Sequence, residues 1–386
     1  MRTVCFVVNS RANYARIKTA IRESISHPNL EVQIVVGASG LLYRFGNVSE
    51  IIERDGFRIT ERIYTVVEGD EPVSMAKTTG LSILSLADAF QRLKPDVVVT
   101  VADRYETIAT AIAASYMNIP VAHTQGGEVT GSIDDNVRHA ITKLSHLHFP
   151  ATQNASSVLS RLGEDKTSIF CVGCPSIDLA YEAPHEEIHL VMNKYSGVGS
   201  EIDFHKPYLL VSQHPDTLEY QESRDQISAT LQAIQELQIQ AIWLWPNVDS
   251  GSDAISKKLR EFREVEKSSR IRFYRNFEPV DYINVLRNSQ CIVGNSSSGI
   301  REASFLGKPS VNVGLRQRGR EKMKNVIDVP YDPGSISRAI QKQIDAGGFE
   351  PDYTYGRGDA GKRIAEILAT NTLSIKKQVI NFNDFQ

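Results

Sequence analysis

An arginine and an aspartate that each follow a short apolar run are the first candidate groups for chemistry. Arg11 comes after the run Thr3–Val8, and Asp103 comes after the run Asp96–Val101. A forked guanidinium at the end of a strand suits a phosphate, although an arginine there can equally hold a carboxylate of the fold. A carboxylate at the carboxyl end of a strand is a common catalytic placement, although Asp is also a favoured N-cap of a following helix. The sequence leaves both alternatives open for each residue.

The densest polar stretch of the chain is 123–135, which contains two adjacent glycines and several carboxylates. Adjacent glycines let the backbone approach a ligand closely. Glu128, Asp134 and Asp135 supply carboxylates for acid–base chemistry, and Asp135 is also a candidate helix cap. The spacing matches no metal site, so we expect no bound metal. We interpret this loop as functional because a loop with so many chemically active groups is more often functional than a plain connection.

Three stretches of the second half favour anion binding. His214 follows the run Tyr208–Ser212 and is suited to bind a phosphate or move a proton, or else to satisfy backbone groups. In Gly294–Glu302 a short apolar run leads into a Gly/Ser loop and a helix, whose free N–H groups suit a diphosphate. Glu302 is placed to accept hydrogen bonds from ribose hydroxyls. Segment 314–320 holds three arginines, which suit phosphate or carboxylate contacts or form a solvated loop.

The elements that must position these groups alternate between short Val/Ile-rich runs and longer amphipathic segments, which predicts parallel α/β sheets covered on both faces. The same alternation occurs twice, so we predict two Rossmann-like doubly wound domains. The predicted strands are Thr3–Val8, Val32–Gly37, Asp96–Val101, Pro120–His123 and Ser168–Val172, then Tyr208–Ser212, Ala241–Trp245, Ile271–Tyr274, Cys291–Val293 and Ser310–Val313. The predicted helices are Ala15–Ser24, Ser82–Leu93, Glu106–Met117, Asp135–Leu147, Arg224–Leu237, Asp281–Arg287, Arg301–Leu306 and Gly361–Leu368.

The 386 residues are enough for two domains, since domains usually hold about 100 to 200 residues. We predict an N-terminal domain over 1–178, a hinge over 178–206, a second domain over 206–360 that carries the anion-binding segments, and a last helix with a loosely held end over 361–386. In such sheets ligands lie beyond the carboxyl ends of the strands, so we expect the site in the cleft between the domains.

Composition excludes several classes of function. The formal net charge is -3 and no basic stretch stands out, so we expect neither nucleic acid nor a membrane surface as partner. No apolar run approaches the roughly 20 residues of a membrane span, and we expect a cytoplasmic protein. The glycine fingerprint of NAD or FAD sites and the lysine of a Walker loop are both missing. Cys171 and Cys174 form one C-x-x-C without a second pair, which favours a structural role.

Four of these segments carry a resemblance: 126–128, 133–143, 213–215 and 294–297. With them the chain resembles the UDP-hydrolysing UDP-N-acetylglucosamine 2-epimerases, which supply sialic and related nonulosonic acid synthesis. The likeness runs from Ser10 to about Gly361. It implies a fold of the glycosyltransferase B type, a homodimer, a UDP-sugar substrate and no cofactor.

The resemblance also implies roles for single residues. It implies that Glu302 binds the ribose, that Asn247 lies at a cleft position of the second domain, and that Asp103 and the loop from Gln125 to Asp135 do the acid–base work. The diphosphate ligands that it implies are Arg11, His214, Ser296, Ser297 and Arg316. The chain departs from the family at Ala102, where Gly is usual, at Gln125, where many relatives have Glu, and at Ser39-Gly40, where several have His. Gln cannot exchange a proton, so we expect Glu128 or Asp134 to take that role.

These residues predict one coherent reaction. Departure of UDP from the first carbon of the sugar, stabilised by the cations and the start of the serine loop, makes the proton on the second carbon removable by Asp103. A glycal results, and water addition with protonation from the opposite face gives N-acetylmannosamine from UDP-N-acetylglucosamine. The alternatives are the same chemistry on UDP-2,4-diacetamido-2,4,6-trideoxyglucose, a UDP-sugar glycosyltransferase, or a non-enzymatic sensor of UDP-sugars.

Overall fold

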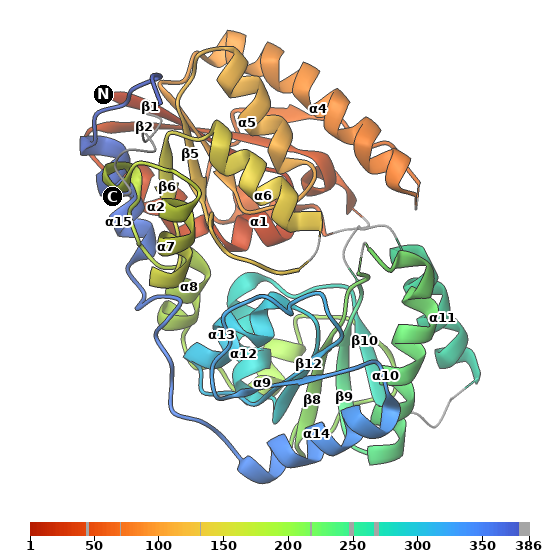
Figure 1. Cartoon of the computed structure of the whole chain (residues 1–386). Coiled ribbons are helices and arrows are strands. Elements are labelled where there is room, and N and C mark those ends of the chain that lie inside the picture. Colours follow the sequence, from red (N-terminus) through yellow and green to blue (C-terminus); the bar gives the residue numbers. More distant parts are fainter. Residues whose placement is uncertain are drawn as a thin grey trace. The chain divides into compact units, whose positions relative to one another are not determined.

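The computed structural model describes residues 1–43, 46–69, 71–131, 133–216, 218–246, 251–265 and 270–377. Their contacts divide the chain into two compact units (Figure 1). The first unit holds the described residues of Met1–Val129, Ile133–Tyr181 and the segment from Thr354 onward, and the second holds those of Thr130–Ser132 and Glu182–Tyr353.

The first unit is built on a parallel sheet. Among the described residues its strand order is β3-β2-β1-β4-β5-β6. This is the doubly wound order, in which the connections change direction between β1 and β4; ligands of such sheets usually bind at the carboxyl ends there. The strands are β1 (Arg2–Val8), β2 (Leu30–Gly37), β3 (Glu61–Ile63), β4 (Val97–Val101), β5 (Val121–Thr124) and β6 (Leu147–Phe149).

Helices cover both faces of this sheet because side chains alternate along each strand. Val4, Phe6 and Val8 of β1 pack in one apolar cluster with α2 and α15, while Cys5 and Val7 pack in a second cluster with α4 and α5. The helices of this unit are α1 (Arg11–Ala15), α2 (Lys18–Ser26), α3 (Val48–Arg54), α4 (Pro72–Leu93), α5 (Thr107–Tyr116), α6 (Ile133–Leu144), α7 (Gln153–Arg161), α8 (Pro175–Glu182) and α15 (Ala360–Thr370), with short 3-10 turns at Ala38–Leu41 and Lys166–Ser168.

The second unit repeats the same winding. Its described strands follow the order β13-β12-β11-β8-β9-β10-β7, parallel except for the edge strand β7, and the change of direction falls between β8 and β11. Its strands are β7 (Val198–Gly199), β8 (Tyr208–Ser212), β9 (Gln240–Leu244), β10 (Ile271–Tyr274), β11 (Cys291–Gly294), β12 (Ser310–Val313) and β13 (Val326–Val329). Its helices are α9 (Ile188–Met192), α10 (Ser223–Leu237), α11 (Ser252–Val265), α12 (Pro279–Asn288), α13 (Arg301–Phe305) and α14 (Pro333–Ala346), with 3-10 turns η4 (Tyr220–Glu222) and η5 (Ser297–Gly299). The predicted fold class is thereby confirmed.

Two predicted elements near the end of the first sheet are wrong. Segment Ser168–Val172 is not a strand; Ile169 makes a single parallel bridge to His148 after a 3-10 turn. The helix predicted to reach Leu147 ends at Leu144, and Leu147 begins the three-residue strand β6. The apolar residues of Ile141–Phe149 suit either period, and a strand of three residues is too short to show its own pattern.

The last helix returns to the first unit. Helix α15 packs against α2 (Figure 1), and Gly361 lies so close to Thr19 that an added Cβ would be 2.6 Å from its carbonyl carbon. Asp178 is 2% exposed and accepts hydrogen bonds from the amides of Ala360 (3.0 Å) and Gly361 (2.7 Å) and from the Thr19 hydroxyl (2.7 Å). One buried carboxylate thus joins three elements and fixes the first turn of α15.

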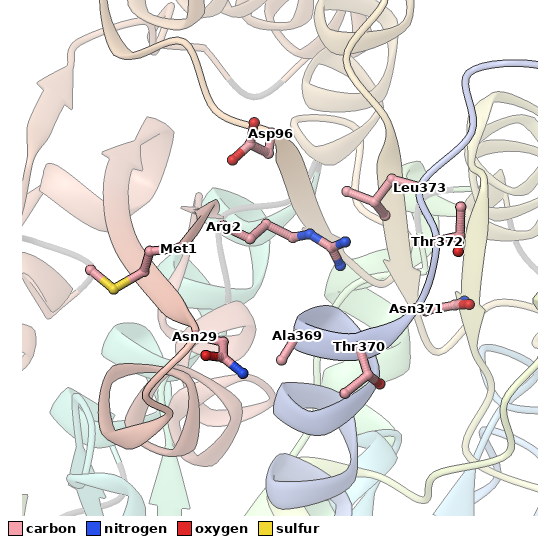
Figure 2. Close-up of a pocket in the computed structure, with 9 residues that line it drawn as sticks. All are labelled: Met1, Arg2, Asn29, Asp96, Ala369, Thr370, Asn371, Thr372 and Leu373. Atoms are coloured by element: carbon pink, nitrogen blue, oxygen red, sulfur yellow. The ribbon is translucent and has the colours of Figure 1, made fainter.

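The C-terminal tail is described as far as residue 377, and residues 378–386 of the predicted loosely held end lie outside the described residues. The tail leaves α15 beside a hollow at the amino ends of β1 and β4, into which the Arg2 side chain extends (Figure 2). The Arg2 guanidinium donates to the Leu368 carbonyl at the end of α15. The hollow is lined by Met1, Arg2, Asn29, Asp96 and residues 369–373. None of the helices in the described ranges is long and apolar enough to span a bilayer.

Candidate active site

In the first unit a buried arginine gathers the candidate acid–base groups. Arg138 lies on α6 with no exposed surface, and one of its terminal nitrogens donates to the carboxylate of Asp103. The other donates to the backbone carbonyl of Glu128 at 2.7 Å and to Asp135 Oδ1 at 2.5 Å. The planar guanidinium fixes the directions of all three contacts, so α6, the 123–135 loop and the end of β4 are held in one arrangement.

The charges of this cluster stabilise one another. Burial alone would lower the pKa of Arg138, but the carboxylates of Asp103, Asp135 and Asp134 outweigh it and raise that pKa. Arg138 therefore remains a cation. A permanent cation in contact with Asp103 favours the charged carboxylate, which is the form able to accept a proton.

Asp103 does not cap the following helix. Helix α5 begins at Thr107, and its N-cap residue is Glu106, which is fully buried and accepts from Arg104 Nε at 2.8 Å. The capping alternative for Asp103 is therefore wrong, and its 7% exposed side chain lies instead on Arg138.

The backbone before Asp103 is held in a conformation that L residues rarely adopt. Ala102 has φ +62°, which costs an alanine about 1–2 kcal/mol. Its amide donates to the Thr124 carbonyl at 3.2 Å, and its carbonyl accepts from His123 Nε2 at 2.9 Å. Burial lowers the pKa of His123 to about 3, so this imidazole is neutral and lies between Ala102 and Thr142 Oγ1, 3.4 Å from its Nδ1. These contacts offset the strain.

The adjacent glycines of the loop are required by packing. Gly127 has φ +80°, and a Cβ there would lie 2.2 Å from the Ala155 carbonyl oxygen of α7. A Cβ on Gly126 would lie 3.0 Å from His123 Nδ1. The glycines let the loop lie directly on α7 and on His123, and this packing sets the position of Glu128, which is 7% exposed.

Gln125 is buried in the same loop with φ +60°. Its backbone amide donates to the Phe149 carbonyl at 2.9 Å, and its side-chain Nε2 lies 3.4 Å from Cys174 Sγ. Cys174 Sγ is in turn 3.1 Å from Ser176 Oγ, and it is a free thiol. The side chain of Gln125 thus contacts a packing group, whereas Asp134 is partly exposed in the first turn of α6.

Arg11 begins α1 immediately after β1, next to the loop that carries Asp103. The Ser10 hydroxyl caps this turn, and Asn13 links the two strand ends by accepting from the Asn9 amide at 3.2 Å and donating to the Val101 carbonyl at 3.4 Å. The carboxyl ends of β1 and β4, where the sheet changes direction, therefore carry Arg11 and Asp103 on loops that are tied together.

In the second unit, Asn295 holds the candidate phosphate ligands. Its side chain accepts from the His214 amide at 2.7 Å and donates to the His214 carbonyl at 2.8 Å. Its own carbonyl accepts from Arg316 at 3.2 Å and from Gln317 Nε2 at 3.1 Å. His214 and Arg316, which follow different strands, are thus joined by one residue, through its side chain and its backbone carbonyl. His214 Nε2 also lies 3.4 Å from Ser212 Oγ.

The Gly/Ser loop forms a tight turn and not the start of a long helix. Gly294 has φ +127°, and a Cβ there would lie 2.2 Å from the Ser212 carbonyl oxygen. Ser296 caps the 3-10 turn η5, which leads into the five-residue α13. Elements this short carry only a small dipole, so local N–H groups and hydroxyls supply most of the attraction for an anion. Ser297 accepts from Arg301 at 2.7 Å.

Glu302 offers a buried acceptor. The residue is 8% exposed, and its Oε2 has no hydrogen-bond partner among the described residues. A buried carboxylate oxygen without a donor is costly, so this atom fits a ligand that brings hydroxyl groups.

Sequence reasoning missed the two residues that organise these clusters, Arg138 and Asn295, although both lie in the quoted segments. An arginine in the second turn of a helix whose first turn carries two aspartates is a usable signal, because a cation that becomes buried requires carboxylates nearby. The predicted Asn247 lies outside the described residues. Within the described ranges, no three His, Cys, Asp or Glu side chains gather in a way that could hold a metal ion.

Two doubly wound parallel units of this kind define a protein of the glycosyltransferase B type fold. A solved UDP-GlcNAc 2-epimerase of Methanocaldococcus jannaschii, in complex with UDP-GlcNAc and UDP, matches with a TM-score of 0.78 at 17% identity and covers 95% of this chain and 99% of its own. A solved UDP-GlcNAc 2-epimerase of Neisseria meningitidis, bound to UDP-GlcNAc, matches with a TM-score of 0.76 at 18% identity. The match covers 96% of this chain and 100% of the Neisseria chain.

The chain belongs to the UDP-N-acetylglucosamine 2-epimerase family, whose sequence model matches residues 22–369. A UDP-N,N'-diacetylbacillosamine 2-epimerase (hydrolyzing) of Legionella pneumophila is 33% identical, over 99% of this chain and 98% of its own length. The polysialic acid biosynthesis protein P7 of Escherichia coli is also 33% identical, over 89% of this chain and 87% of its own length.

Substitution of Arg138 tests the buried cluster. Arg138→Met leaves the carboxylates of Asp103 and Asp135 without their cation, so we expect the free energy of unfolding to fall by about 3–5 kcal/mol in urea denaturation. Arg138→Lys keeps the charge but not the forked guanidinium, so its free energy of unfolding should lie between those of wild type and Arg138→Met. Arg161→Met, on the exposed last turn of α7, is the control and should stay within about 0.5 kcal/mol. A loss below about 1 kcal/mol in Arg138→Met would contradict the account.

Proposed function

We propose that the protein is a hydrolysing 2-epimerase of a UDP-linked 2-acetamido sugar, releasing UDP and the free sugar inverted at its second carbon. The observation that carries this proposal is the cluster in which Arg138 holds Asp103 beside the Glu128 and Asp135 segments. A transferase that only moves a sugar has no need of several carboxylates around a strand end. A sensor has no need of a strained backbone that orients one of them.

The second unit would bind the nucleotide. His214 and Arg316, joined through Asn295, supply donors for the two phosphates, together with Arg11 of the first unit and the hydroxyls of Ser296 and Ser297. Glu302 Oε2, buried without a donor, would accept from the ribose hydroxyls. These contacts would stabilise the negative charge that develops on UDP as the bond to the sugar breaks.

The first unit would supply the acid–base steps. The bond between the first carbon and the UDP oxygen breaks with its electron pair going to UDP, and Asp103 takes the proton from the second carbon. A double bond between the two carbons, a glycal, results. Water then adds its oxygen to the first carbon and gives up one proton, while the second carbon takes a proton on its other face from Glu128 or Asp134. The proton given up by the water restores that acid. Asp103 returns its proton to solvent.

The relatives favour a particular substrate. The Legionella protein and a Campylobacter jejuni protein, 31% identical over 88% of this chain, are both named as hydrolysing 2-epimerases of N,N'-diacetylbacillosamine nucleotides. A UDP-N-acetylglucosamine 2-epimerase of Neisseria meningitidis is 28% identical over 99%. We therefore place the UDP-2,4-diacetamido-2,4,6-trideoxy sugar first. UDP-N-acetylglucosamine, giving N-acetylmannosamine for sialic acid synthesis, is the second candidate.

Product analysis with a carboxylate variant tests the reaction. Wild-type protein incubated with each UDP-sugar, without an acceptor, should release UDP and the inverted free sugar, seen by phosphorus and proton NMR. Asp103→Asn should lower kcat by about 10²–10⁴-fold while its Kd for UDP stays within about twofold, because the nucleotide contacts are untouched. Asp359→Asn, at an exposed position before α15, is the control. Turnover of Asp103→Asn at the wild-type rate would remove Asp103 from the mechanism.

A nucleotide comparison tests Glu302. If its carboxylate accepts from the ribose 2′-hydroxyl, wild-type protein should bind UDP about tenfold more tightly than 2′-deoxy-UDP. Glu302→Gln should reduce this preference to about twofold, as measured by calorimetry. Glu350→Gln, exposed in the same unit, should keep the wild-type ratio. If Glu302→Gln kept the wild-type preference for UDP over 2′-deoxy-UDP, Glu302 Oε2 would not bind the 2′-hydroxyl.

We further propose a homodimer formed through α4. Val73, Gly80 and Leu84 follow at spacings of seven and four residues, which places them on one side of the helix, and Val73 (51%) and Leu84 (67%) are exposed. Gly in a helix interior costs about 1 kcal/mol relative to Ala, and a Cβ on Gly80 would meet no described atom within 4 Å beyond the neighbouring backbone of α4 itself. A second copy of the same helix would use that open space and cover the apolar side chains.

Oligomeric state tests this interface. Wild-type protein should sediment as a dimer, and Leu84→Asp, which places a charge in the interface, should sediment as a monomer. Leu190→Asp, a matched exposed leucine on α9 (54%), should remain a dimer. A dimeric Leu84→Asp protein would show that copies associate elsewhere, and a monomeric wild type would end the proposal.

A further inference from the structure

The C-terminal tail of the first unit ends its described course in a buried charge cluster. Lys377 Nζ lies 2.6 Å from Glu164 Oε2 and also donates to the carbonyls of Thr142 and Lys143, each at 2.9 Å. These two carbonyls belong to the last turn of α6, where few amides remain to satisfy them. The Thr142 carbonyl also accepts from the Ser145 amide at 3.1 Å, so Lys377 is its second donor. The ammonium thus caps the carboxyl end of α6 and complements its dipole.

Glu164 gives this contact its strength. Its side chain is fully buried and is also approached by Lys143 Nζ at 2.9 Å and His148 Nε2 at 3.1 Å. Burial alone would raise the pKa of Glu164, but the donors from His148, Lys377 and Lys143 lower it to about 2. Glu164 is therefore an anion at neutral pH and needs its cations.

A second contact holds the tail against the sheet. His146 accepts from the Val121 amide at its Nδ1 (3.1 Å), and its Nε2 therefore donates to the Ile375 carbonyl (3.2 Å). Segment 374–377, which we call the strap, is thus tied both to β5 and to α6. Nothing in the proposed chemistry uses these groups, and the strap lies at the other end of α6 from Asp134 and Asp135.

Two routes lead from the strap to Asp103. The first is α6 itself, about 18 Å long at 1.5 Å per residue, which carries Arg138 and so the ion pair with Asp103. The second is a chain of side chains. Thr142, whose carbonyl Lys377 binds, reaches His123 Nδ1 with its hydroxyl (3.4 Å), and His123 Nε2 donates to the Ala102 carbonyl (2.9 Å). Ala102 is the strained residue immediately before Asp103.

We propose that the strap is a positioning device in which Lys377, by capping α6 beside Thr142, sets the placement of Asp103 for the reaction. Both routes end on this aspartate. Lys377 touches no reacting group, so it acts through Thr142, His123 and Arg138. A shift of α6 by a fraction of an ångström would move Arg138 and, with it, Asp103, and a misplacement near 1 Å can cost about 10²-fold in rate. The expected changes in kcat rest on the proposed function, whereas the expected change in the position of Asp103 does not.

Four variants separate positioning from mere anchoring. Lys377→Met keeps the length of the side chain and removes the charge, and Lys377→Arg restores a cation. Thr142→Val keeps the backbone carbonyl that Lys377 binds and removes only the hydroxyl that faces His123. Lys376→Met, at the exposed neighbouring position, is the matched control. Rates are divided by the number of UDP-binding sites in each preparation, so a loss of folded protein does not count as a loss of catalysis.

The kinetic outcome discriminates the two roles. Lys377→Met should lower kcat by about 10- to 100-fold with KM and the Kd for UDP within about twofold. Lys377→Arg should recover most of the wild-type kcat. In Thr142→Val kcat should fall about tenfold, and in Lys376→Met it should equal the wild-type value. A tail that only anchors the fold would lower the melting temperature of Lys377→Met and leave kcat per UDP site unchanged, which would overturn the proposal.

Hydrogen exchange keeps the test independent of the proposed reaction. In Lys377→Met the amides of 102–107 and 134–138 should exchange faster than in wild type, whereas those of the second unit should not change. If wild type shows no epimerase activity, the proposed function fails and this exchange pattern still tests the strap. Unchanged protection of 102–107 in Lys377→Met would overturn the inference whatever the activity.

Discussion

The first unit depends on one constraint: the Arg138 guanidinium is fully buried and must be surrounded by acceptors. Its fork reaches Asp103, Asp135 and the Glu128 carbonyl, which come from three separate segments. The cost of leaving any of these charges unpaired inside the protein is far larger than the strain of the surrounding backbone. The left-handed Ala102, the glycines packed on α7 and the neutral His123 are the local arrangements that let three segments meet one cation.

In the second unit a neutral residue, Asn295, joins separate loops as Arg138 does in the first. Asn295 binds both backbone groups of His214 and presents its own carbonyl to Arg316 and Gln317. The side chain and the backbone carbonyl of this one residue thus hold the loops of His214 and Arg316 together. Both clusters lie where the winding of their sheet changes direction, at β1 and β4 in one unit and at β8 and β11 in the other. The repeated fold therefore supplies two places of the same kind, one rich in carboxylates and one suited to an anion.

The sequence predicted most strands to within two residues, because parallel strands buried on both faces must be continuous apolar runs. It also predicted the loops that carry Asp103, Glu128, His214 and Ser297, since these loops follow directly from strand ends. It did not predict which groups meet. The partnership of Arg138 with Asp103 depends on how α6 is rotated on the sheet, and the return of α15 depends on Asp178, 182 residues from Ala360. Such long-range contacts leave no periodic signal.

The central claim is that a carboxylate held by a buried arginine removes a proton from carbon while UDP departs. Its most direct test is the reaction run to completion in water labelled with both deuterium and oxygen-18, followed by mass spectrometry of UDP and of the released sugar. The account predicts one deuterium at the second carbon of the sugar and no oxygen-18 in UDP, since the sugar–oxygen bond breaks. A sugar that keeps its original hydrogen at that carbon, or UDP that carries oxygen-18, would contradict it.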